Sequence, residues 1–275
     1  KYYSYLCSIK LKNTKIMNKK YKLTEESISV KGRTLYRIEA IRDFYTITKG
    51  QKGGFVESER NLSQNGNAWI GGNAKVYDNA RVYDNATVSD NAIVSGNVCV
   101  SDNARVRGEA NVSGYAFVYG DAKVSGNAII YGHSTICGNS LVFGNANVSD
   151  NAIVSDDARV YDDANVSGNA CVIENSFVKG NAEVYGHAMI CGNAIVCGNA
   201  YISGDDDYIV FKNWWSSGRY FTWTRSNNMW KVGCFYGTGE ELIEKAYKDS
   251  EKSGREYERV VKYVESILSD EKKYI

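Results

Sequence analysis

The sequence predicts an all-β fold in which a short stretch of chain coils repeatedly around one axis. Two observations support this prediction. Twenty-three consecutive six-residue units run from Gly66 to Ser203, and most are close to the pattern Gly/Asp-Asn-Ala-x-Val-x. The chain of 275 residues also contains no proline. A fixed period over half of a chain is typical of a solenoid, in which each unit buries its apolar face only against its neighbours.

The residue types within one unit predict its local structure. A small residue (Ala, Ser or Val) recurs at every sixth position from Ala68 to Ala200, and Val or Ile recurs two positions later, from Ile70 to Ile202. Residues two apart in an extended segment point to the same side, so both columns should face the core. Gly and Asn, which tolerate left-handed backbone angles, precede them and predict a tight corner.

This small-x-aliphatic pattern resembles the repeat of the hexapeptide-repeat family. The resemblance implies a left-handed parallel β-helix of triangular cross-section with three units to a coil. Twenty-three units then give 7–8 coils, and a rod of about 37 Å at ~4.8 Å between strands. We expect the helix to span residues 55–204. Val56 and Leu62 continue the small column before the repeats, and residues 53–58 are interpreted as the entry coil.

The segment before the repeats predicts a second structural unit. Residues 17–54 include stretches of alternating residues, as in Ser27-Ile28-Ser29-Val30, and predict a small β-rich cap. Met17 resembles a natural start, so residues 1–16 are interpreted as a non-native leader or a disordered segment. The run from 53 to 63 is similar to hexapeptide-repeat proteins encoded by phages and prophages, which implies a phage-encoded protein.

The six-residue period stops before a run of three carboxylates. We interpret Asp205-Asp206-Asp207 as a solvated linker, because three consecutive carboxylates on an extended chain cannot all face one cation. Residues 205–237 alternate between turn signals and predict a three-stranded antiparallel meander rich in aromatic residues. Residues 238–275 predict helices, with a capping box at Thr238 and a break near Ser253-Gly254.

One of the three outward faces of the predicted coil is too apolar to remain in water. The resemblance implies subunits that pack their coils about a threefold axis, so a homotrimer is the leading expectation. Coverage by the C-terminal helices is the alternative. The predicted oligomer face contains Cys99, Phe117, Tyr119, Ile153, Ile173 and Met189.

The repeats contain two histidines, and acyltransferases of the hexapeptide-repeat family use a histidine as a general base. His133 and His187 replace the corner Asn in two nine-residue segments that match at seven positions and start 54 residues apart. A tandem duplication explains the pair, and three coils, about 14 Å, should separate the two imidazoles. No inserted loop walls a pocket. We therefore expect no catalytic residue, with acyl transfer by His133 or His187 as the alternative.

The densest group of aromatic and basic residues follows the repeats, where four of the five tryptophans lie. Rings beside guanidinium groups suit a small anionic ligand that resembles a nucleotide or a sugar. The alternative is a small core against the C-terminal helices. The candidate ligand-binding residues are Trp214, Trp215, Arg219, Phe221, Trp223, Arg225 and Trp230.

Composition narrows the class of protein. A net charge of +1 predicts no attraction to a nucleic acid polymer or a membrane surface, and no apolar run approaches the ~20 residues of a membrane span. Two histidines cannot supply the three zinc ligands of carbonic anhydrases with this fold, so we expect neither a metal nor a cofactor. Seven cysteines without paired spacing favour the cytoplasm, that of the host if a phage encodes the protein.

The sequence therefore predicts a non-enzymatic, trimeric scaffold or binding protein that presents its aromatic module to a small ligand or a protein. A purely structural component of a phage or cell is a further alternative.

Overall fold

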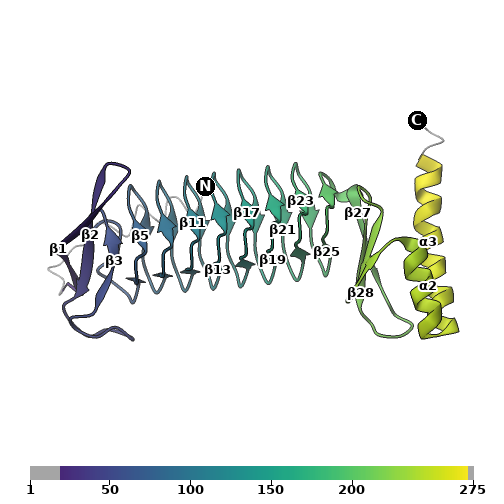
Figure 1. Ribbon diagram of the computed structural model, residues 1–275, viewed down its shortest axis with the longest axis horizontal. Helices are drawn as coiled ribbons and strands as arrows, with labels where there is room; N and C mark the ends of the chain where they lie inside the picture. Colours follow the sequence, from purple (N-terminus) through teal and green to yellow (C-terminus); the bar gives the residue numbers. More distant parts are fainter. Residues whose placement is uncertain (1–18, 272–275) are drawn as a thin grey trace.

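The computed structural model describes residues 19–271, and the predicted leader at residues 1–16 lies outside this range. The described chain forms a rod with a small module at each end (Figure 1). The N-terminal module contains β1 (Tyr21–Val30), β2 (Arg33–Ala40) and β3 (Lys52–Val56), which pair antiparallel in this order. Strand β3 also pairs in parallel with the first coil, so this module is continuous with one sheet of the rod.

The rod consists of two-residue strands in three parallel sheets, each forming one face. The mixed face is β4 (Trp69–Ile70), β7 (Thr87–Val88), β10 (Arg105–Val106), β13 (Lys123–Val124), β16 (Leu141–Val142), β19 (Arg159–Val160), β22 (Phe177–Val178) and β25 (Ile195–Val196). The polar face is β5 (Lys75–Val76), β8 (Ile93–Val94), β11 (Asn111–Val112), β14 (Ile129–Ile130), β17 (Asn147–Val148), β20 (Asn165–Val166), β23 (Glu183–Val184) and β26 (Tyr201–Ile202). The apolar face is β6 (Arg81–Val82), β9 (Cys99–Val100), β12 (Phe117–Val118), β15 (Thr135–Ile136), β18 (Ile153–Val154), β21 (Cys171–Val172) and β24 (Met189–Ile190).

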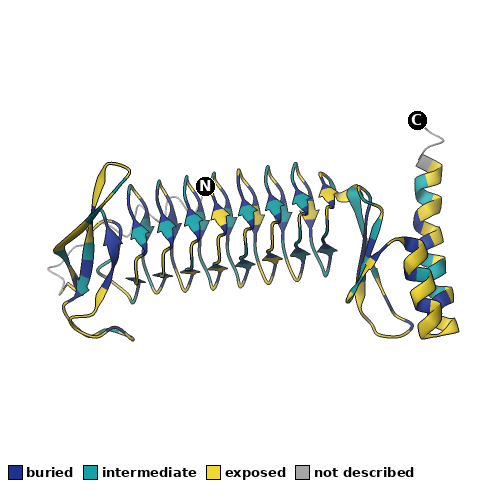
Figure 2. Cartoon of the chain, in the orientation of Figure 1, coloured by how far each residue is buried: buried dark blue, intermediate teal, exposed yellow. Residues whose placement is uncertain are grey.

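The register confirms three units to a coil. Neighbouring strands of one sheet are 18 residues apart, as in Arg105 beside Lys123. Every residue of the small and aliphatic columns between 68 and 202 is fully buried, so both columns face the core (Figure 2). The predicted parallel β-helix of 7–8 coils is therefore the observed fold.

The predicted phase of the entry coil is wrong. Val56 pairs with Val76 and Leu62 with Val82, so both residues continue the aliphatic column and not the small one. These partners are 20 residues apart, because the first coil contains two more residues than the later ones. Gly54 occupies the small column instead, and a Cβ there would collide with the Ala74 carbonyl.

The corners show how the chain turns without proline. The first corner residue has a positive φ, for example 72° at Gly108 and 61° at Asp90. A left-handed angle is unfavourable for a residue with a Cβ. The Asp90 carboxylate compensates by accepting a hydrogen bond of 2.9 Å from the Gly108 N–H in the next coil. Asp and Gly therefore exchange freely at this position of the repeat.

One buried hydroxyl of the small column provides a stability test. Ser140 Oγ has no hydrogen-bond partner among residues 19–271, whereas Ser176 Oγ donates to the Ile173 carbonyl at 2.7 Å. An unsatisfied buried hydroxyl costs about 1–3 kcal/mol. We expect Ser140→Ala to stabilise the protein by about 1 kcal/mol and Ser176→Ala to destabilise it by a similar amount. Urea unfolding of both variants checks this, and a loss of stability in Ser140→Ala would contradict it.

The C-terminal module begins with a 3₁₀ turn, η1, and continues with four strands and two helices. Its elements are η1 (Asp205–Asp207), β27 (Tyr208–Lys212), β28 (Tyr220–Thr224), β29 (Met229–Val232), β30 (Phe235–Gly237), α2 (Gly239–Asp249) and α3 (Glu251–Glu271). The strands form an antiparallel sheet in chain order. The predicted third strand is divided in two, because Gly233 adopts a φ of 55° and reverses the chain.

The helices differ from the prediction at one boundary. The capping box is confirmed, with Glu241 N–H donating to Thr238 Oγ1 at 3.3 Å. The break lies at Ser250, and α3 runs straight through Gly254. A Cβ on Gly254 would overlap the Tyr247 ring. Gly254 therefore serves the close contact between the helices and does not end one.

Candidate functional site

The rod has two chemically different ends, because all its strands run in the same direction. Within the repeats the N–H of the first residue of each strand donates to a carbonyl of the following coil, as Ile93 does to Ala110 at 2.9 Å. The aliphatic residue after it points its N–H toward the preceding coil, as Val82 does to the Asn61 carbonyl at 2.9 Å. The corner Asn and the outward residue after the strand also donate forward, as Asn91 does to Gly108 and Ser95 to Val112. The first coil is therefore left mainly with carbonyls that need donors, and the last coil mainly with N–H groups that need acceptors.

Side-chain donors close the carbonyl end. The Lys20 ammonium is fully buried and donates to the carbonyls of Asn65, Gly66 and Ala68, the last at 2.8 Å. Burial, together with a smaller contribution from the charge of Arg42, lowers the pKa of Lys20 to about 8. This end therefore contains a buried cation that carbonyl oxygens hold.

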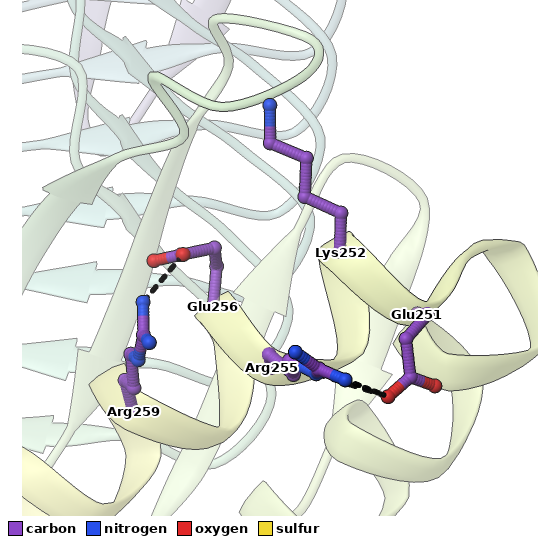
Figure 3. A pocket seen from close by; sticks show the side chains of 5 residues that line it. All are labelled: Glu251, Lys252, Arg255, Glu256 and Arg259. Carbon is purple, nitrogen blue, oxygen red and sulfur yellow. Dashed lines mark hydrogen bonds and ion pairs between the residues drawn. The ribbon is translucent and has the colours of Figure 1, made fainter.

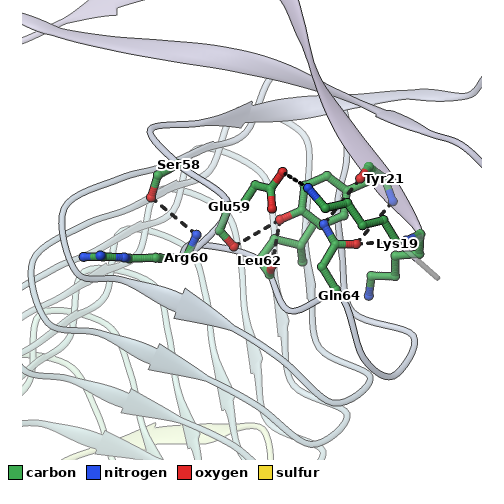
Figure 4. A network of polar contacts seen from close by, with 8 residues as sticks. Lys19, Tyr21, Ser58, Glu59, Arg60, Leu62 and Gln64 are labelled. Atoms are coloured by element: carbon green, nitrogen blue, oxygen red, sulfur yellow. Dashed lines mark hydrogen bonds and ion pairs between the residues drawn. The ribbon is translucent and has the colours of Figure 1, made fainter. Parts of the chain in front are cut away.

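A second set of contacts joins the N-terminal module to the same coil (Figure 4). The Tyr21 hydroxyl donates to the Leu62 carbonyl at 2.7 Å, and Gln64 Oε1 accepts from the Lys20 N–H at 2.9 Å. Burial raises the pKa of the Tyr21 hydroxyl, and the charge of Glu59 adds to the effect. Each of these contacts satisfies a backbone group, so the network is structural.

Side-chain acceptors close the opposite end. Five N–H groups of the last coil each meet one side-chain oxygen: Met189 to Asp205 Oδ1 (2.9 Å), Cys191 to Tyr208 Oη (3.4 Å), Ile195 to Thr222 Oγ1 (2.8 Å), Tyr201 to Ser226 Oγ (2.7 Å) and Ser203 to Asp207 Oδ2 (2.7 Å). The interpretation of 205–207 as a solvated linker is therefore wrong. Although burial opposes it, hydrogen bonds from Ser203 and Gly204 hold the pKa of Asp207 below its usual value.

Most of the candidate ligand-binding rings are buried in the C-terminal module. Phe221, Trp223 and Trp230 are at most 2% exposed, and Trp215 also belongs to their cluster with α2 and α3. Trp223 Nε1 donates to Asn228 Oδ1 at 2.9 Å. These rings form a small core against the C-terminal helices, which was the alternative to ligand binding. They have no free face on which a ligand could stack.

The other three candidates lie nearer the surface. Trp214 is 74% exposed on the loop after β27, and Arg219 is exposed on the same loop. Arg225 is half-buried, and its Nε donates to the Asp206 carbonyl at 3.1 Å. Arg225 therefore helps to anchor the module to the rod, and the structure does not gather the seven candidates into one site.

The two histidines occupy the same corner of the rod and are both exposed. The His133 ring stacks on Tyr115 of the preceding coil, with centroids 4.8 Å apart. Asn151 and Asn169 fill the corner between His133 and His187 and are hydrogen-bonded to each other. Within residues 19–271 neither imidazole has a hydrogen-bonded side chain that would orient it as a general base.

The two best-formed hollows of the described residues are shallow and open to solvent. One on α3 is lined by Glu251, Lys252, Arg255, Glu256 and Arg259 (Figure 3). Two of its cations are already paired, Arg255 with Glu251 at 2.9 Å and Arg259 with Glu256 at 2.7 Å. Such a surface is a set of ordinary helix ion pairs and offers no convergent binding groups.

The described residues hold neither a metal-binding cluster nor a membrane-spanning helix. No group of three His, Cys, Asp or Glu side chains within residues 19–271 is placed to hold a metal ion. None of the helices in the same range is long and apolar enough to cross a membrane. The six cysteines of the described chain are all free thiols.

No other segment within residues 19–271 covers the apolar face along the middle of the rod. Ile153 is 38% and Met189 43% exposed, Phe117, Tyr119 and Ile173 are half-buried, and Cys99 is buried. The C-terminal helices pack on the terminal sheet at the end of the rod and do not cover this face (Figure 1). Coverage by these helices, the alternative to self-association, is therefore not what the structure has.

Comparison with protein-family models gives a match to the YdcK beta solenoid repeat, at residues 74–90 and 80–96. The matched residues lie entirely in the first coils of the rod, so the similarity concerns the repeat and not the end modules. No curated protein matches the sequence.

Proposed function

We propose that this protein is a non-enzymatic β-solenoid scaffold that associates with further copies of itself through its apolar face. The observation that supports the proposal is a face that runs over several coils and that no other described segment covers. At the two outward positions of each unit between residues 99 and 191, this face carries no charged side chain. Interface cores are depleted in charge and enriched in aromatic residues and Met, as this face is.

The other two faces support the choice by contrast. The mixed face carries cations such as Arg105, Lys123 and Arg159, all exposed, and the polar face is rich in Asn and Ser. Such faces remain solvated at little cost, whereas an apolar face of this length is unfavourable in water. A rod with one apolar face is therefore suited to lateral association.

Two functions considered from the sequence receive no such support. Acyl transfer would need an oriented imidazole beside a pocket, and His133 and His187 are exposed on a corner without one. Binding of a small anionic ligand would rest on Trp214 and Arg219 alone. The other candidate rings are buried in the core, and Arg225 donates a hydrogen bond to the Asp206 carbonyl.

The chain offers a matched pair of variants that tests the proposal. Ile153 on the apolar face and Ile129 on the polar face occupy the same position of the repeat, and they are 38% and 43% exposed. We expect Ile153→Lys to weaken association at least ~100-fold, because it buries an unpaired charge at the interface. Ile129→Lys should leave association unchanged.

Size-exclusion chromatography with light scattering measures the effect over a dilution series. Equal association of both variants and the parent would contradict the proposal, as would a parent that remains at the chain mass of 30.5 kDa. Both substitutions leave the core columns intact, so the thermal unfolding of the rod serves as the control.

A further inference from the structure

The outermost strand of the C-terminal sheet, β27, has a free hydrogen-bonding edge. Within residues 19–271 the sheet order is β27-β28-β29-β30, so in this part of the chain β27 pairs with β28 alone. Asn213 N–H donates to the Arg219 carbonyl at 2.7 Å, and Arg225 N–H donates to the Asp207 carbonyl at 2.8 Å. In this antiparallel ladder the backbone groups of the odd-numbered residues between 207 and 213 form the hydrogen bonds to β28. The N–H and C=O groups of Tyr208, Val210 and Lys212 therefore point away from the sheet.

This free edge borders the apolar face of the rod. The Tyr208 hydroxyl donates to the carbonyl of Met189, in the last strand of that face, at 2.7 Å. The next strand, β28, lies instead against the mixed face through Thr222 and Ile195. The edge of β27 and the apolar face are thus on the same side of the molecule, and one neighbour can cover both.

We propose that β27 pairs antiparallel with β27 of a second copy about a twofold axis parallel to the rod, so that the apolar faces meet in a symmetric dimer. This inference rests on the proposed self-association and specifies its partner surface and symmetry. The threefold arrangement implied by the resemblance is incompatible with it, because two identical antiparallel edges pair only about a twofold axis.

The sequence of β27 is self-complementary in this arrangement. Centring the axis on Val210 places Val210 opposite its own copy, Ile209 opposite Phe211, and Tyr208 opposite Lys212. The only charged residue of the strand therefore faces an aromatic ring and lies far from its own copy. β-Branched and aromatic cross-strand pairs stabilise a sheet, whereas like charges directly opposite destabilise it.

Helix α3 supplies a second reason for a partner strand. The Tyr263 ring contacts Phe211 of β27 at 6.5 Å between centroids, yet it is 57% exposed. Ile267, one turn further along the helix and on the same side as Tyr263, is half-buried. A strand added beside β27 would lie under these two residues and extend the sheet beneath the helix.

Proline substitutions on the full chain separate edge pairing from face packing. The N–H groups of Val210 and Lys212 point away from β28, so a proline at either position removes no hydrogen bond within one chain. It does remove a bond of the paired edges and adds a ring there. We expect the parent to be a dimer in native mass spectrometry and light scattering, and Val210→Pro and Lys212→Pro to dissociate at least ~100-fold more readily.

Near-ultraviolet circular dichroism shows whether the tryptophan core of each proline variant is intact. A dimer that persists in a folded proline variant would overturn the pairing, and so would a parent trimer. If Ile153→Lys dissociates but the proline variants do not, the apolar face mediates association without β27. The function proposed above then stands while this inference fails.

Hydrogen exchange of the unmodified chain gives a second, independent measurement. The amides of Tyr208, Val210 and Lys212 should exchange slowly in the concentrated protein and rapidly after dilution to the monomer. Rapid exchange at both concentrations would show an open edge and would also overturn the pairing.

Discussion

Replacement of Trp223 by Ala should destabilise the C-terminal module by about 3–5 kcal/mol, the range for removing a large aromatic side chain from a core. Trp223 is 1% exposed, and its indole N–H is bonded to Asn228. The same change at Trp214, which is 74% exposed, should alter stability by less than about 0.5 kcal/mol. The two tryptophans lie in one module, so Trp214→Ala is the matched control.

The measurement follows the two parts of the molecule separately. Tryptophan fluorescence reports mainly on the module, which contains four of the five tryptophans. Far-ultraviolet circular dichroism reports on the rod. We expect Trp223→Ala to lower the unfolding midpoint of the module and to leave most of the rod folded. Equal stability of the two variants would show that the ring of Trp223 is not a core residue.

The second large effect concerns the buried ammonium at the carbonyl end. The pKa of Lys20 is lowered from 10.5 to about 8, first by burial and then by the charge of Arg42. Between these two pH values the unfolded chain binds more protons than the folded chain, so stability rises with pH. The gain should be about 3 kcal/mol when the pH passes from below 8 to 10.5.

Lys20→Met isolates this gain from the titration of the many tyrosines. Methionine keeps an unbranched apolar stem but has no proton to lose, so the variant should lack the rise. Urea unfolding of parent and variant at both ends of the pH range gives the difference between their free energies of unfolding. Parallel pH profiles would mean that the folded state does not depress the pKa of Lys20.

The rod was predictable from the sequence because its stability is decided within and between adjacent units. Alanine two positions before valine, every six residues, specifies which side chains face the core without any information on distant contacts. The phase of Val56 and Leu62 was not predictable in the same way. Their pairing with Val76 and Val82 depends on two additional residues in the first coil, and residue type alone does not locate such an insertion.

The end modules depend on tertiary contacts, and the predictions for them were less complete. Asp205 and Asp207 have the composition of a linker, and only the unsatisfied N–H groups of the last coil make them acceptors. A glycine near a helix end commonly marks a C-cap, but Gly254 serves a contact between helices. The repeats themselves did predict that acceptors would be needed here, because the last coil of any parallel solenoid has N–H groups without a following coil to bond.

In the candidate site, too, features set by the repeat were predictable and features set by tertiary contacts were not. The composition of the apolar face was visible from 18-residue steps through the repeats. Whether rings such as Trp223 meet a ligand or a helix depends on where α2 and α3 dock, and an amphipathic stripe does not name its partner. The edge of β27 could not be located before the strand order was known.

The complementary ends of each coil make the rod a molecular ruler. Inserting or deleting 18 residues adds or removes one whole coil, and the coils on either side then pair through the same backbone groups as before. Neither end module therefore needs to change. Each such step alters the distance between the modules by ~4.8 Å. The segments 131–139 and 185–193, which match at seven of nine positions and lie three coils apart, are what duplication by whole coils leaves behind. Gene duplication can therefore tune the reach of this protein in discrete increments while its two ends stay as they are.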